Sequence, residues 1–196
     1  MTTIWERKFG DDYQVRNTSI IAEVTNRIKL WEKIGKNLHS VKSVYEIGCG
    51  MGANLHAIRW LNPNLSIYGC EPNKFGYEYL KNNKFIVDNS NYLDVTPIMH
   101  ADIVFTYGML IHTHKDDLYN TMEKMYIQSN RYIVMCEYFR PKREMLMYRD
   151  MPNQMWGDEY GKVFLDYFRV KPLDCGFMWK ETTGLDNITY WVFEKE

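Results

Sequence analysis

The sequence predicts an α/β fold in which a mostly parallel β-sheet has helices on both faces. Three observations support this. Short apolar runs alternate with segments of helical periodicity along most of the chain. The first buried run, residues 41–47, leads into a glycine-rich turn and then into an apolar helix pattern over 53–61. The next run, residues 66–70, ends at a carboxylate, Glu71. A strand, a glycine-rich turn and a helix open a nucleotide-binding βαβ unit, so we expect a Rossmann-like sheet.

Length and composition limit what the protein can be. With 196 residues, the chain has room for one domain, 1–196, with its own core. Its 24 Lys and Arg against 25 Asp and Glu give no electrostatic reason to expect a nucleic-acid or membrane partner. The N-terminus lacks the apolar run of a signal peptide, and no run is long enough to span a bilayer. We therefore expect a cytoplasmic protein whose partner is a small molecule.

The four cysteines are far apart and form no C-x-x-C pair. Three of the four (Cys49, Cys70, Cys136 and Cys175) lie in or at the ends of expected strands, which predicts buried free thiols and a reducing compartment. No metal ligation is expected from this pattern.

The N-terminal segment, residues 4–17, is polar and aromatic with little periodicity, and a helix is expected over 18–38. Two interpretations of the segment stay open. It is either a frayed arm or a lid over a cofactor, with Tyr13, Arg16 and Asn17 facing the ligand.

The first half of the sheet continues beyond the second strand. Pro72 and Asn73 open a helix that reaches about residue 81, and a short strand follows over 84–87. The loop after that strand is where an adenine edge is expected to be recognised, by Asp88 or Asn89. The alternative is a plain Asx turn.

The second half begins with a strand over 101–107, followed by Gly108 and then His112. Ligands of open parallel sheets bind beyond the carboxyl ends of the strands, so His112 is a candidate catalytic base or, alternatively, a structural histidine. A helix over 116–128 and a strand over 132–138 follow, and the latter brings Glu137 and Tyr138 to the same edge as further catalytic candidates.

Residues 140–157 show neither helical nor strand periodicity and are rich in Met, Arg and Pro. We expect either a solvated basic loop or a lid whose Arg143 and Arg149, with Tyr138 and Tyr148, grip an anionic substrate. A helix over 158–168 and an antiparallel pair of strands, 173–180 and 188–194, complete a predicted sheet of seven strands.

The glycine-rich turn fits two cofactors. Read as G-x-G-x-x-A (Gly48, Gly50, Ala53), it is a dinucleotide fingerprint. Read as E-x-G-x-G-x-G from Glu46, it resembles motif I of class I S-adenosylmethionine (SAM) methyltransferases. A carboxylate would repel a pyrophosphate and attract the ammonium of a methionine, which favours SAM. A glycine-rich turn without a ligand remains the third possibility.

More of the chain resembles one methyltransferase family, the pseudaminic acid biosynthesis-associated methylases. The stretches that carry this resemblance are 9–17, 46–48, 108–112 with 116–118, 129–133, 137–139 and 174–177. It implies the class I methyltransferase fold, with a reversed strand at the C-terminal end of the sheet. The fuller glycine set and the segment 140–157 depart from the family pattern.

This resemblance implies a SAM-dependent methyltransferase that acts on a small polar metabolite, such as an acidic sugar or sugar-nucleotide intermediate, and releases S-adenosylhomocysteine. The alternatives are an NAD(P)-binding oxidoreductase and a non-catalytic subunit with the same fold. Whether the protein is a monomer or a homodimer stays open. The residues expected to hold the cofactor, in addition to the N-terminal lid, are Glu46, Gly48, Gly50, Asn54, Glu71, Pro72, Asp88, Asn89 and Gly108.

Overall fold

The computed structural model describes residues 4–16, 20–94, 99–149 and 151–196, with Met151 described by its backbone only. The chain forms two compact units, Met1–Met99 and His100–Glu196. Each unit has its own strands, helices and buried side chains.

The first unit is built on three parallel strands in the order β3-β2-β1. Their bounds are β1 Ser43–Ile47, β2 Ser66–Cys70 and β3 Ile86–Asp88. In the register, Val44 lies beside Ile67 and Cys70 beside Asp88. The apolar runs that predicted β1 and β2 are buried along most of their length, as expected for central parallel strands.

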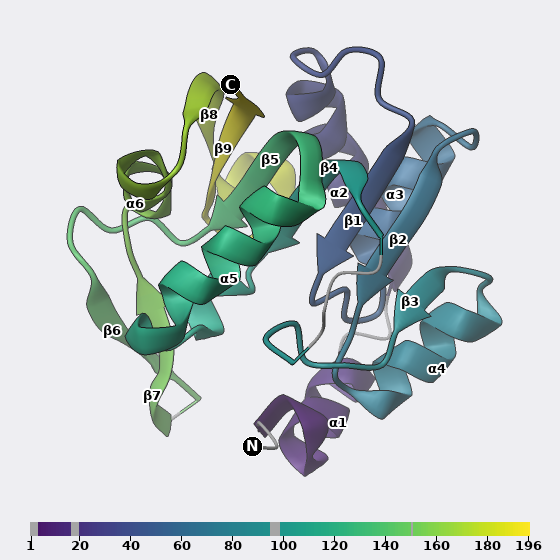
Figure 1. The fold of residues 1–196 in the computed structure, drawn as a ribbon. Coiled ribbons are helices and arrows are strands. Elements are labelled where there is room, and N and C mark those ends of the chain that lie inside the picture. Colours follow the sequence, from purple (N-terminus) through teal and green to yellow (C-terminus); the bar gives the residue numbers. More distant parts are fainter. Residues whose placement is uncertain (1–3, 17–19, 95–98, 150) are drawn as a thin grey trace. The chain divides into compact units, whose positions relative to one another are not determined.

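The helices of the first unit pack in two pairs: α2 lies against α3, and α1 lies against α4 (Figure 1). Their bounds are η1 Ile4–Glu6, α1 Lys8–Arg16, α2 Ile20–Gly35, α3 Ala53–Leu61 and α4 Lys74–Asn82. Asn73 caps α4, because its side-chain oxygen accepts a hydrogen bond from the backbone N–H of Gly76 at 3.0 Å.

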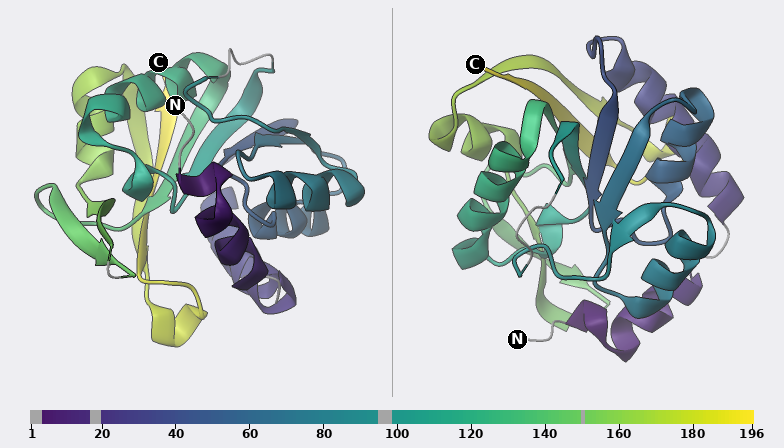
Figure 2. Two further views of the ribbon diagram at one scale, coloured as in Figure 1. Left: turned by 90° about the horizontal axis from the view of Figure 1, so that it is seen from below. Right: turned by 45° about the vertical axis from the view of Figure 1, so that its right-hand side comes forward.

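The second unit has four sheet strands in the order β4-β5-β9-β8. Strands β4 and β5 are parallel, whereas β9 runs antiparallel to both of its neighbours, β5 and β8. Helix α5 packs on β4 and β5, and α6 packs on β5. A separate two-stranded antiparallel ribbon, β6–β7, projects beside this sheet (Figures 1 and 2). The bounds are β4 Ala101–Tyr107, η2 Leu110–His112, α5 Lys115–Gln128, β5 Ser129–Glu137, β6 Glu144–Tyr148, β7 Met151–Gly157, α6 Tyr160–Tyr167, β8 Val170–Met178, α7 Lys180–Thr183 and β9 Ile188–Lys195.

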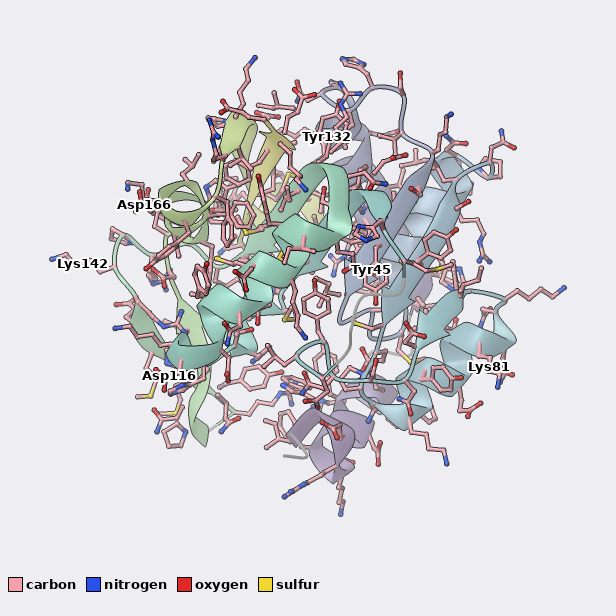
Figure 3. The ribbon with its side chains drawn as sticks, viewed as in Figure 1. Tyr45, Lys81, Asp116, Tyr132, Lys142 and Asp166 are labelled. Carbon is pink, nitrogen blue, oxygen red and sulfur yellow. The ribbon has the colours of Figure 1, made fainter. Side chains whose placement is uncertain are left out.

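Each unit buries its own apolar side chains. Figure 3 labels Tyr45 on β1 and Tyr132 on β5, both of which are buried, while Lys81, Lys142 and Asp166 reach outward. The fully buried side chains of the first unit include Leu30, Ile34, Leu55 and Leu80, and those of the second include Val104, Phe105, Met122, Ile133, Val134, Phe164 and Val192.

The predicted α/β fold is confirmed: the two units together supply seven strands, mostly parallel in the β1–β5 part, with β9 reversed. The bounds expected for β2, α3 and β4 agree with the structure.

Two segments contain elements that were not expected. Residues 4–16, whose sequence shows little periodicity, contain η1 and α1. Residues 140–157 contain the β6–β7 ribbon, whose strand pattern is obscured by a register shift between Leu146 and Tyr148 and by the left-handed backbone of Arg149 and Asn153. Within the described residues, no helix is both long and apolar enough to cross a membrane.

Candidate functional site

The turn after β1 has an unusual backbone. Gly48, Gly50 and Gly52 have φ values of 74°, 54° and 76°, in the left-handed region that residues with a Cβ rarely adopt. The turn then starts α3 with Gly52 as its N-cap, and no side chain caps this end. The N–H groups of Gly48 and Cys49 donate to the carbonyl oxygen of Cys70, so the backbone of the turn is held against β2. The three glycines, which have no Cβ, let a ligand approach this backbone closely beside the uncapped N-terminus of α3.

Strand β2 passes directly beneath this turn. A Cβ at Gly69 would overlap the sulfur of Cys49 and would lie 2.7 Å from the carbonyl oxygen of Glu46. The turn can therefore lie this close to β2 only because position 69 has no side chain. Cys49, Cys70 and Cys136 are buried free thiols, whereas Cys175, which lies in the predicted strand 173–180, is a free thiol that is exposed.

Glu71, at the end of β2, holds the turn in place. One carboxylate oxygen accepts the N–H of Gly50 at 2.7 Å, and the other accepts the N–H of Asn73 at 2.9 Å. The side-chain amide of Gln14 donates to the second oxygen at 3.5 Å. Burial raises the pKa of Glu71 to about 7, against the opposing effect of the two backbone hydrogen bonds.

Glu46, on β1, is buried and only half satisfied. One oxygen accepts the amide of Asn54 at 2.6 Å, and Asn54 in turn accepts the indole N–H of Trp31 at 3.1 Å. The other carboxylate oxygen of Glu46 has no hydrogen-bond partner among the described residues. Burial raises the pKa of Glu46 to about 8, although the nearby charge of Arg27 opposes the shift. Such a group favours a cationic or hydrogen-donating ligand.

Of the three N-terminal residues expected to face the cofactor, Tyr13 and Arg16 differ in how far they are buried. Tyr13, in α1, is half-buried, with its ring edge-on to Trp5 at 5.4 Å between centroids, whereas Arg16 is exposed. Asn17 lies outside the described residues. The residue of α1 that reaches the turn is Gln14, which the sequence reasoning missed. Gln14 lies four residues after Gly10, the other buried residue of α1, so both residues lie on the same face of this helix.

The candidates after β2 and β3 form a local backbone network. The side-chain amide of Asn89 donates to the carbonyl oxygens of Glu71 at 2.9 Å and Pro72 at 3.2 Å. Asp88 is exposed, and its carbonyl accepts the N–H of Glu71 at 3.0 Å. These contacts hold the segment that follows Glu71, and the role of Asp88 and Asn89 towards an adenine remains a proposal.

In the second unit, Glu137 organises the turn that follows β4. Gly108 has a φ of 61°, and the next three residues turn their N–H groups towards the Glu137 carboxylate. The N–H groups of Met109 and Leu110 donate to one oxygen at 3.3 and 3.2 Å, and that of Ile111 donates to the other at 3.2 Å. Glu137 is fully buried, and burial raises its pKa to about 7. These contacts hold the turn that leads to His112, and the catalytic role expected for Glu137 stays a prediction.

His112 ends this turn and contacts the β6–β7 ribbon. Its Nδ1 lies 2.6 Å from the carbonyl oxygen of Gln154, so Nδ1 carries the proton and Nε2 carries the lone pair. Its ring lies edge-on to Tyr148 at 5.0 Å between centroids. Burial lowers the pKa of His112 to about 4, against the opposing effect of the Gln154 carbonyl. The imidazole is therefore neutral at physiological pH.

Arg143, expected to grip an anion, already has partners within the protein. Its guanidinium pairs with the Asp158 carboxylate at 3.1 Å and donates to the carbonyl of Thr113 at 2.7 Å. It also lies over the ring of Trp156 at 5.3 Å. These contacts fasten the ribbon to the segment that follows His112.

The other substrate candidates lie at or near the ribbon. Arg149 is exposed, has a left-handed backbone and lies 5.8 Å from the ring centroid of Tyr148. The hydroxyl of Tyr138 donates to Asp186 at 3.1 Å. Among the described residues, no group of three or more His, Cys, Asp or Glu side chains could hold a metal ion.

The depressed pKa of His112 predicts that this residue favours folding less in acid. The unfolded chain binds a proton near pH 6.5 and the folded protein only near pH 4, so the stability that neutral His112 provides is present above pH 6.5 and is lost as the pH falls towards 4. The raised pKa values of the buried Glu46, Glu71 and Glu137 act in the opposite direction, and they do so equally in the wild type and in His112→Asn. In urea unfolding, the stability of the wild type relative to His112→Asn should therefore fall by roughly 2 kcal/mol between pH 7.5 and pH 5. A stability difference that does not change with pH would contradict the assignment.

Comparisons with known proteins add the fold family. No protein-family model matches the sequence, so the resemblance to the pseudaminic acid methylases finds no support there, and no curated protein matches it. Solved structures do match. The magnesium protoporphyrin IX methyltransferase of Synechocystis PCC 6803, with bound S-adenosylhomocysteine, superposes with a TM-score of 0.72 at 11% identity. The match covers 98% of this chain and 97% of that one.

Two further methyltransferase structures also match this chain. The 1,6-didemethyltoxoflavin-N1-methyltransferase of Burkholderia thailandensis has a TM-score of 0.67 at 12% identity, covering 95% of this chain and 83% of its own. The plantazolicin methyltransferase BpumL, in complex with S-adenosylhomocysteine, has a TM-score of 0.67 at 11% identity, covering 97% and 90%. At such identities the likeness establishes the fold alone. The chain has the Rossmann-like fold of class I SAM-dependent methyltransferases.

Proposed function

We propose that the protein is a SAM-dependent methyltransferase that acts on a small polar metabolite. The observation that carries this proposal is Glu46, a buried carboxylate with one oxygen that lacks a partner among the described residues, on the strand that leads into a turn of three left-handed glycines. Burying an unsatisfied carboxylate costs free energy, and an ammonium donor offsets that cost. A pyrophosphate would instead add negative charge near Glu46 and Glu71.

The first unit holds residues suited to each part of SAM. Glu46 would accept a hydrogen bond from the methionine ammonium, and Gly48 and Gly50 would let the methionine portion approach the backbone. Each oxygen of Glu71 can accept more than one hydrogen bond, so its carboxylate would take ribose hydroxyls while it retains Gly50 and Asn73. When bound, SAM would supply an electrophilic methyl group to an oxygen, nitrogen or carbon atom of the acceptor and would leave as S-adenosylhomocysteine.

His112 is proposed to orient the acceptor. Its Nε2 lone pair suits a hydrogen bond from an acceptor hydroxyl or amine, and its neutrality at physiological pH keeps Nε2 unprotonated. Glu137 would contribute indirectly, because it fixes the backbone that leads to His112. Arg143 is paired with Asp158, which leaves the exposed Arg149 as the stronger candidate for contact with an anionic acceptor.

The finer proposal, that the acceptor is an acidic sugar or sugar nucleotide, rests on the sequence resemblance and on Arg149. A panel of sugars with and without a carboxylate or phosphate, incubated with SAM, tests it through the release of S-adenosylhomocysteine. Faster turnover of the charged members supports it, and equal turnover of neutral ones overturns it.

The cofactor is tested by calorimetry. We expect S-adenosylhomocysteine to bind with a Kd near the micromolar range, about −8 kcal/mol, and NADH to show no measurable heat. Glu46→Gln keeps the size of the side chain but removes its charge, so it should weaken binding. Binding of NADH, but not of S-adenosylhomocysteine, would identify an oxidoreductase and end the methyltransferase proposal.

A further inference from the structure

Helix α1 is fastened to the first turn of α4 by polar contacts. The side-chain amide nitrogen of Asn73 donates to the Asp11 carboxylate at 2.8 Å and to the carbonyl of Trp5 at 3.1 Å. Asn73 is itself buried, and its oxygen caps α4. The N-terminal segment is thus positioned against the element that follows Glu71, and one of its side chains points inward.

That side chain is Gln14, which is only 2% exposed. Its amide nitrogen donates to Glu71 at 3.5 Å, a long hydrogen bond, and its amide oxygen has no hydrogen-bond partner among the residues that the structure describes. A buried amide oxygen without a donor is unfavourable in the folded protein. One weak hydrogen bond is too little to account for burying a polar side chain at this position.

The side chains of Gln14 and Glu71 and the backbone of Gly50 all lie next to the Cα of Gly76. A Cβ placed on Gly76 would lie 2.9 Å from the carbonyl oxygen of Gly50, 3.1 Å from the amide nitrogen of Gln14 and 3.1 Å from Cγ of Glu71. A Cβ placed on Gly50 would lie 3.6 Å from the amide oxygen of Gln14. The amide oxygen of Gln14 therefore faces the glycine turn beside the carboxylate.

We propose that Gln14 is a second ligand of the cofactor's nucleoside diol, accepting a hydrogen bond from a ribose hydroxyl through its amide oxygen while Glu71 accepts another. This inference rests on the proposed function, since it concerns the same cofactor. It assigns the recognition of the ribose to two elements far apart in sequence, the end of β2 and helix α1. Binding of the diol then completes the polar contacts of a side chain that the folded protein leaves half satisfied.

The test is a double-mutant cycle in which the second change is made in the ligand. S-adenosylhomocysteine and its 2′-deoxy and 3′-deoxy forms are titrated against the wild type and Gln14→Leu, which keeps the size but removes both polar atoms. Loss of one hydrogen bond should weaken S-adenosylhomocysteine binding about 5- to 15-fold in Gln14→Leu. One of the deoxy ligands should lose a similar factor on the wild type but little more on the variant, because the same hydrogen bond is then removed twice.

A matched variant separates this role from a structural one. Asp11→Ala removes a contact that fastens α1 to Asn73 but does not touch Glu71. If Asp11→Ala weakens binding, the loss should be equal for all three ligands. The affinity difference between S-adenosylhomocysteine and its deoxy forms should then be the same as in the wild type. Circular dichroism melting confirms that both variants are folded.

The two proposals fail in different ways. If Gln14→Leu binds S-adenosylhomocysteine like the wild type, or if its loss is the same for every ligand, Gln14 is no diol ligand, although the methyltransferase proposal stands. If the wild type binds none of the three ligands, the proposed function itself is wrong.

Discussion

Gly69→Ala should unfold at a much lower urea concentration than the wild type, with a loss of about 3 kcal/mol in the free energy of unfolding. The added methyl group would overlap the Cys49 sulfur and lie 2.7 Å from the Glu46 carbonyl oxygen. The sulfur can move only within a packed core, and the carbonyl oxygen belongs to the backbone of β1. Removing this overlap therefore requires β1 or the glycine turn to shift, so cofactor affinity should fall together with stability.

Gly35→Ala is the matched control for this substitution. Gly35 ends α2 and is exposed, and a Cβ added there would meet no atom within 4 Å. Its φ is not left-handed either. Alanine at this position should leave stability unchanged or raise it by about 0.4–1 kcal/mol, because the unfolded chain loses conformational freedom. If Gly69→Ala unfolds at the same urea concentration as Gly35→Ala, the close approach of β2 to the turn is not rigid.

Glu71→Ala should weaken S-adenosylhomocysteine binding by about 5- to 150-fold, measured by calorimetry, which corresponds to a loss of roughly 1–3 kcal/mol. Two effects add. The variant loses the acceptor proposed for the ribose, and it frees the N–H groups of Gly50 and Asn73 that the carboxylate now fixes. The glycine turn would then sample other conformations before binding.

Two further variants separate the effect of the Glu71 charge on affinity from the effect of removing any carboxylate nearby. Glu71→Gln retains one carbonyl oxygen, so it should bind more tightly than Glu71→Ala and more weakly than the wild type. Glu78→Ala removes an exposed carboxylate from α4 and should have no effect. Unchanged affinity in Glu71→Ala would contradict the ribose assignment and would show that the turn keeps its conformation without the carboxylate.

The parts of the fold that depend on local pattern were predictable. The glycine turn, α3 and the carboxylate at the end of β2 follow from residue types at fixed spacing, because a buried strand, a left-handed turn and an amphipathic helix each have a local signature. Glu46 and Glu71 were identified for the same reason.

The parts that depend on contacts between distant segments were not predictable. Gln14 meets Glu71 across 57 positions, and nothing near Gln14 in the sequence indicates that contact. Arg143 appeared to be a basic side chain in an irregular loop, but its charge is paired with Asp158, which follows β7 at the same end of the ribbon. Glu137 was predicted as a reserve catalytic base at a strand end, and its contacts with three backbone N–H groups of the turn after β4 could not be foreseen from its position in the sequence.

The place of β9 between β5 and β8 has a consequence for synthesis on the ribosome. Both neighbours are made first, and each pairs with β9 along its length, Tyr132–Glu137 on one side and Val170–Met178 on the other. Until residues 188–195 emerge, these two strands present unpaired backbone edges to other chains. The nascent protein is therefore exposed to aggregation through these edges until β9 is made, and slower translation of that segment would lengthen the exposure.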